Sequence, residues 1–214
     1  SAQMLAQSIR EAISANDGRG IVTELDLSFS SAVSALNESW NGQPLFAGER
    51  QGNGPIKITT LDALVNATGP EAIFDEAARH QTVDVGIGAP IVVSAKASEM
   101  SQGLFDTFAD LKRLLNASGG TLGQPISADD TTELTALAER LDAEAAKFTN
   151  EEGRAGQVQS RLETEQVRLS ERSNLLKKEI GDQADADVGE VSIKLSALMV
   201  QYEATAKTFS ELSK

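Results

Sequence analysis

Several residue types that support common protein chemistry are missing from this chain or scarce in it. Its 214 residues include no cysteine, which excludes disulfide bonds, thiol nucleophiles and zinc sites built from thiolates. Aromatic residues are few, with one tryptophan, one tyrosine and seven phenylalanines. We therefore expect a core made mainly of leucine, valine, isoleucine and alanine.

Positive charge is scarce as well, and long apolar runs are absent. The formal net charge is −13 at pH 7 and the basic residues form no patch in the sequence, so binding to nucleic-acid phosphates is disfavoured. No apolar run reaches the roughly 18 residues of a transmembrane candidate, and residues 1–6 lack the basic flank of a signal peptide. We expect neither nucleic acid nor membrane as a partner, and either a cytosolic location or export without an oxidising folding compartment.

The strongest pattern in the chain is an apolar heptad repeat in residues 154–214. Its spacing of three and four residues keeps one stripe facing a partner helix. Glycine and aspartate in residues 181–187 are typical of a helix stop followed by a helix start. We therefore predict two helices that fold back on each other. Their packing seam would contain Val158, Leu162, Leu169, Leu176, Val188, Val191, Leu195, Leu198, Tyr202 and Phe209.

Helical periodicity is also clear elsewhere. Residues 2–15 and 21–41 predict an antiparallel helical pair, because the glycine-rich and Asx-rich residues 16–20 between them favour a turn. Residues 101–116 form an amphipathic pattern, and residues 128–180 predict one very long helix or two stacked helices. A pattern of that length is typical of an elongated bundle.

The middle of the chain has a mixed pattern. Residues 56–60 alternate and predict a strand, while residues 61–67 and 71–79 favour short helices. Residues 82–87 and 90–95 predict two strands that pair as a hairpin.

These elements together predict an α+β fold in two domains. Residues 1–47 and 120–214 would form an elongated antiparallel helical bundle that is discontinuous in sequence. Residues 48–119 would form a small mixed α/β domain inserted into it.

The single histidine, His80, is the first candidate for catalysis. A catalytic base needs a nucleophile or an orienting carboxylate nearby, and the sequence identifies neither. Four acidic residues of the same segment could supply a carboxylate pair, but their spacing matches no hydrolase motif. We interpret them as solvated surface residues and assign no catalytic residue. These acidic residues are Asp62, Asp75, Glu76 and Asp84.

Two further patterns favour structural roles over ligand binding. Gly86 and Gly88 resemble part of a phosphate-binding loop, but no helix follows at the required distance, so we interpret them as a hairpin turn. Asp182, Asp185 and Asp187 resemble calcium ligands, but they lack the spacing and the bidentate glutamate of an EF-hand. Helix capping explains these aspartates better. We assign no metal site and no cofactor.

Four motifs follow one another in a particular order along the chain. An Asn-Gly turn and an extended stretch occupy residues 39–48, a second motif occupies residues 153–163, and an aspartate-rich turn precedes a final heptad helix. This order resembles the bacterial flagellin superfamily. Residues 45–48 and 202–213 are more similar to its hook–filament junction proteins than to filament flagellins. The residues that carry the turn motif are Asn41, Gly42, Phe46 and Gly48.

The resemblance implies a structural role in the bacterial flagellum, linking hook to filament by helical packing. It implies an extracellular location and export by the flagellar type III apparatus without a cleaved signal peptide. Its implied partners are other axial proteins (hook-associated proteins and flagellin) and copies of the chain itself. The long terminal helices of the family lie outside this sequence, so the resemblance implies a truncated core that stays monomeric.

Other functions stay open at this point. Filament flagellin would share the same pattern of helices. A surface binding module could instead use the middle segment to capture a glycan or a receptor. An enzyme is the alternative that the sequence favours least.

Overall fold

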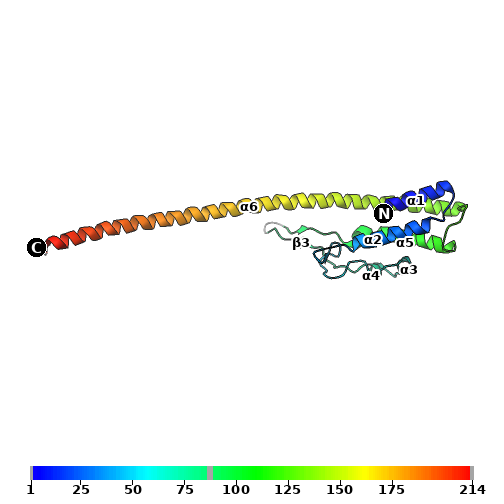
Figure 1. The fold of residues 1–214 in the computed structure, drawn as a ribbon, viewed down its shortest axis with the longest axis horizontal. Coiled ribbons are helices and arrows are strands. Elements are labelled where there is room, and N and C mark those ends of the chain that lie inside the picture. Colours follow the sequence, from blue (N-terminus) through cyan, green and yellow to red (C-terminus); the bar gives the residue numbers. More distant parts are fainter. Residues whose placement is uncertain (1, 86–88, 213–214) are drawn as a thin grey trace. The chain divides into compact units, whose positions relative to one another are not determined.

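The computed structural model describes residues 2–85 and 89–212, but not the side chains of residues 182–188 and 201–212. Most of the described residues are helical, and two small antiparallel sheets have two strands each (Figure 1). The chain divides into one unit of residues 1–159 and another of residues 160–214.

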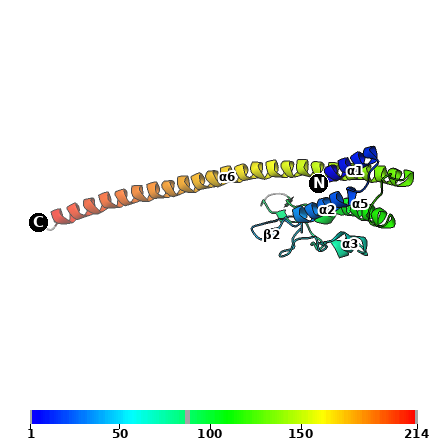
Figure 2. The same ribbon diagram turned by 45° about the vertical axis from the view of Figure 1, so that its right-hand side comes forward.

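The first unit begins with two helices that run in opposite directions, as predicted (Figures 1 and 2). Helix α1 spans Ala2–Ala15 and helix α2 spans Ile21–Leu36. Helix α2 ends before residue 41 because the chain changes direction at Asn37. The Asn37 Oδ1 atom accepts a hydrogen bond from the Ile56 N–H at 2.8 Å, and its Nδ2 atom donates to the Ile56 carbonyl at 3.2 Å.

A short hairpin follows α2 in place of its predicted last turn. Strand β1 (Ser39–Trp40) pairs with strand β2 (Gln43–Pro44) in an antiparallel register. Asn41 and Gly42 connect them with φ values of 51° and 78°. Two consecutive positive φ angles are typical of a type I′ hairpin turn, which Asn-Gly forms at little cost.

The middle segment has less regular structure than its pattern predicts. Helix α3 (Leu61–Val65) agrees with the prediction. Helix α4 (Pro70–Ile73) is much shorter than the helix predicted over residues 71–79, because Phe74 is extended. The strand predicted over residues 56–60 is reduced to one bridge between Ile56 and Phe74. Its alternation reflects the burial of Ile56, and not a paired strand.

The hairpin predicted from residues 82–87 and 90–95 is confirmed, but its two strands are shorter than predicted. Strand β3 (Thr82–Val83) pairs antiparallel with strand β4 (Ile91–Val92), with Thr82 opposite Val92. Gly86 and Gly88, which we interpret as its turn, lie outside the described residues.

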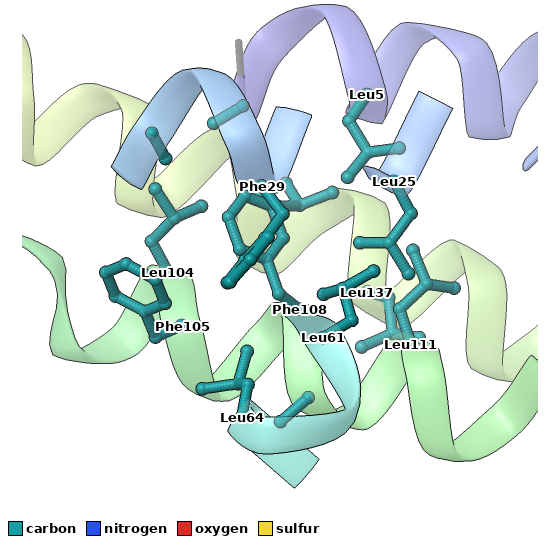
Figure 3. Packing of buried hydrophobic residues seen from close by; sticks show 14 of the residues in the cluster. Leu5, Leu25, Phe29, Leu61, Leu64, Leu104, Phe105, Phe108, Leu111 and Leu137 are labelled. Atoms are coloured by element: carbon teal, nitrogen blue, oxygen red, sulfur yellow. The ribbon is translucent and has the colours of Figure 1, made fainter. Parts of the chain in front are cut away.

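Helix α5 (Ala97–Ala117) is central to the first unit. It extends the helix predicted over residues 101–116 at both ends. Phe105, Phe108 and Leu111 on this helix are completely buried, and α5 contacts both α2 and α3. Figure 3 shows its side chains between those of the neighbouring helices.

One hydrophobic cluster joins the terminal helices to the middle segment. Leu5 and Leu25 come from the first two helices, and Leu61 and Leu64 come from α3 (Figure 3). Leu137 comes from the helix that begins at Ala128. Because both predicted domains contribute to this cluster, their independent folding stays a prediction that unfolding experiments can test.

Helix α6 spans Ala128–Leu212 and has 85 residues. It continues through residues 181–187, so the predicted turn and the fold-back of two helices are wrong. No proline interrupts that stretch, and a single internal glycine such as Gly181 costs a helix only about 1 kcal/mol relative to alanine. In the described part of the chain, neither α6 nor any other helix is long and apolar enough to cross a membrane.

Candidate helix-packing surface

The most exposed part of the predicted seam lies near the end of the described side chains. Val191, Leu195 and Leu198 are 63%, 55% and 62% exposed. They follow one another at intervals of four and three residues, so they share one face of α6. Burying an apolar side chain of this size stabilises by about 1.5–3 kcal/mol. This face is therefore suited to covering by another helix.

The earlier part of the seam is less continuous. Val158 and Leu162 are half-buried, whereas Leu169 and Leu176 are 42% and 48% exposed. Leu162, Leu169 and Leu176 recur every seven residues, with charged residues between them. This spacing gives one leucine per heptad, so packing here combines apolar and charged contacts.

Helix α6 also exposes apolar side chains outside the predicted seam. The side chains of Val188, Tyr202 and Phe209 lie outside the described residues, as do those of Asp182, Asp185 and Asp187. Strict heptad counting leaves out several exposed apolar residues elsewhere on α6, some of which, such as Ile193 and Val200, lie on the face opposite the stripe. An unweighted search for apolar residues would have found them. These are Val167, Leu175, Ile180, Ile193, Met199 and Val200.

The second half of the turn motif, residues 46–48, forms a tightly packed corner in the first unit, whereas Asn41 and Gly42 are exposed. The Phe46 carbonyl accepts a hydrogen bond from the Ala97 N–H at 2.9 Å, and Ala47 is completely buried. Gly48 has a φ of 63°, and a Cβ atom there would lie 2.3 Å from the Arg79 carbonyl oxygen. Only glycine combines this φ with so close an approach. The motif thus joins the residues after α2 to the start of α5.

His80 lies beside the same corner and has two partners. Its Nδ1 atom is 3.1 Å from the Ser94 carbonyl oxygen, and its Nε2 atom is 3.2 Å from Glu99 Oε1. The Ser94 hydroxyl accepts from the Gln81 N–H at 2.9 Å. These contacts connect the β3–β4 hairpin to the first turn of α5.

Glu76, predicted to be a solvated surface residue, is instead largely buried, with its side chain 12% exposed, and it supports the start of α5 from outside the helix. Its carboxylate accepts hydrogen bonds from the Ser98 N–H at 3.0 Å and from the Ser98 hydroxyl. Free N–H groups at a helix N-terminus require such partners. Lys96 neutralises the surrounding acids, with its Nζ atom 3.1 Å from Glu99 and 3.9 Å from Glu76.

Two of the other acidic candidates pair with different cations. Asp75 lies 2.7 Å from an Arg50 nitrogen, and Asp62 lies 3.5 Å from Lys112 Nζ. Each of these carboxylates thus has its own cation, and Asp62 and Asp75 do not form a shared carboxylate pair. Among the side chains that the structure describes, no group of three histidine or acidic residues could hold a metal ion.

Comparisons with known proteins give no relative of this chain. No family model matches it, and no curated protein or solved structure does so either. Two features of the chain therefore bear on its function: the exposed stripe of α6 and the order of motifs in the sequence.

Proposed function

We propose that the chain is a structural subunit of the bacterial flagellum and that it joins the hook to the filament. The observation that carries this proposal is the exposed apolar stripe of α6 at Val191, Leu195 and Leu198. Exposed apolar side chains at heptad spacing favour burial against another helix. The order of the other motifs, which resembles the flagellin superfamily, supports this particular kind of polymer, although α6 is continuous where the resemblance places an aspartate-rich turn.

The proposed mechanism is mechanical. Helices of neighbouring copies and of other axial proteins cover the stripe, and charged residues beside it set the register of packing. In the assembly, the helices of residues 1–47 and 120–214 form an elongated bundle. Residues 48–119 face outward in it while they share the hydrophobic core of α1, α2 and the start of α6. The subunit needs no cofactor and performs no catalysis in this role.

The proposed location is extracellular, on the flagellum. The subunit reaches it through the flagellar type III apparatus without a cleaved signal peptide. The absence of cysteine supports this route, since folding after export then requires no disulfide formation.

Substitution of the stripe in the gene tests the proposal. In cells that encode the chain, Leu195→Asp together with Leu198→Asp should leave hooks without filaments, because two charges oppose burial of the seam. Filament protein should still accumulate in the medium. The matched control is Ser196→Asp, which adds a charge at an exposed position of α6 away from the stripe. We expect the control cells to keep their filaments.

Other outcomes would identify the alternatives. If the purified chain alone polymerised into long filaments, filament flagellin would be the better interpretation. If filaments persisted in the stripe variant while attachment to a glycan or receptor depended on residues 48–119, a binding module would be favoured. Intact filaments without any such attachment would leave the structural proposal without support.

A further inference from the structure

A groove opens in the first unit beside the turn motif. It consists of two adjoining hollows of about 380 Å³ and 460 Å³. Phe46, Met100, Phe148 and Glu152 line both hollows, so the two lie side by side on the same face of the unit. Its wall on α6 extends from Ala145 to Val158, a helical length of about 20 Å at 1.5 Å per residue.

The floor and the rim of the groove differ in chemistry. Phe46, Met100 and Phe148 are half-buried and provide an apolar floor. Glu151 and Glu152 provide acidic groups at the edge, with Arg154 beside them. The whole of residues 1–159 is acidic, with 11 basic and 22 acidic residues. An apolar helix face with basic flanks would complement such a groove.

One segment of the chain has these properties. Residues 160–180 contain five basic and four acidic residues, whereas the first unit has an acidic excess. Leu162, Leu169 and Leu176 span about 21 Å along the helix, which matches the length of the groove. By helical spacing, Arg172 and Lys177 lie on opposite sides of this leucine stripe. Glu165, paired with Arg168 at 2.7 Å, lies at its edge.

We infer that the groove binds residues 160–180 of a second copy of this chain. The inference rests on the proposed function, because it identifies one contact between subunits of the polymer. The groove and the segment are different surfaces, so the contact is heterologous and repeats from copy to copy. Such a contact extends an open series wherever its rotation does not close a ring.

The lack of cysteine makes this contact directly testable by crosslinking. One copy carries Ala155→Cys, at an exposed position that lines the groove. The other carries Ser173→Cys, on the same face as Leu169 and Leu176, or Asn174→Cys, on the opposite face. A disulfide requires Cα atoms within about 7 Å. After oxidation at high protein concentration, we expect several-fold more crosslinked heterodimer with Ser173→Cys than with Asn174→Cys.

Two blocking variants test each surface separately. Ala35→Trp fills the groove from an exposed position, and Leu169→Asp with Leu176→Asp removes the apolar stripe. Each should suppress the Ala155–Ser173 crosslink. Thr164→Asp adds a charge on the other side of α6 and should leave the crosslink unchanged. Circular dichroism of each variant checks that its helices are kept.

Three results would overturn the inference. Equal crosslinking at positions 173 and 174 would mean random collision. No crosslink from Ala155→Cys to either Ser173→Cys or Gln166→Cys, which lie on the stripe face in the two halves of the segment, would mean that the groove is not the binding surface. Predominant pairing of Ser173→Cys copies with each other would mean that the stripe packs against itself. The last result would contradict binding at the groove but would leave the proposed flagellar role intact. Failure of the flagellar role is a separate result, namely filaments that persist in the Leu195→Asp, Leu198→Asp variant.

Discussion

At the scale of single residues, Phe105 connects the parts of the first unit. Its ring makes edge-to-face contacts with Phe29 and Phe74, at centroid distances of 6.0 Å and 5.7 Å. Phe108 adds a third contact at 6.2 Å. Such aromatic pairs stabilise beyond the burial of their area. Phe105 thereby links α2 and the residue after α4 to α5.

Removal of this ring should weaken the whole first unit. We expect Phe105→Ala to lower the free energy of unfolding by about 3–5 kcal/mol, because it deletes a large buried side chain and leaves a cavity. Urea denaturation followed by circular dichroism measures the change. Leu27→Ala serves as the control, since Leu27 is 59% exposed and should change stability little. Similar losses in both variants would contradict the central place of Phe105.

Asp17 gives the turn before α2 a dependence on pH. The Arg19 side chain donates hydrogen bonds to the Asp17 carboxylate, and the Arg19 backbone N–H donates a further, weaker one. These bonds lower the pKa of Asp17 to about 2, below its ordinary value. A depressed carboxyl pKa adds stability at neutral pH that disappears as the pH falls from about 4 to about 2. Asp17→Asn should remove this part of the acid sensitivity. The pH dependence of the melting temperature measures it, and an unchanged acid profile would contradict the argument.

At the scale of elements, α6 is continuous where glycine and aspartate suggested a turn. A Cβ atom at Gly181 would meet nothing within 4 Å. Gly181→Ala should therefore increase helix content and stabilise α6 by about 1 kcal/mol. Thermal melting followed at 222 nm measures this change. Gly48→Ala is the opposite control, because its positive φ and its close approach to Arg79 should make alanine destabilising. A loss of helicity in Gly181→Ala would restore the predicted turn.

The sequence predicts the helices better than the extended segments. Residues 2–15 and 101–116 have a clear helical period, because one face of each helix is buried in the core. The alternation around Ile56 arises from burial of single residues in an irregular segment. This alternation therefore could not show that the Asn37 side chain, and not a neighbouring strand, forms hydrogen bonds with the Ile56 backbone.

The candidate site was predictable only in part. Heptad spacing identified Leu195 and Leu198 on one face of a helix, and the structure leaves that face exposed. The groove could not be predicted, since Phe46, Met100 and Phe148 come from separate segments that only the fold brings together. No local pattern in the sequence records such a combination.

At the scale of the whole molecule, charge and apolar surface are unevenly distributed. Residues 1–159 contain twice as many acidic as basic residues, whereas residues 160–180 have a slight basic excess. Exposed leucine and valine side chains are frequent beyond residue 160. Apolar burial would supply most of the association energy between subunits, and the charges would favour contacts between unlike regions. This distribution is suited to a chain that completes its packing by assembly.

Accessibility of the stripe in assembled flagella tests the central claim most directly. Leu195→Cys and its control Ser196→Cys introduce the only thiol of the chain, on the stripe and away from it respectively. We predict that maleimide labels both thiols in the purified chain, because both positions are exposed. In intact flagella, labelling of Leu195→Cys should fall at least tenfold relative to Ser196→Cys. Equal labelling of the two positions in flagella that contain the protein would contradict the claim that α6 packs through this stripe.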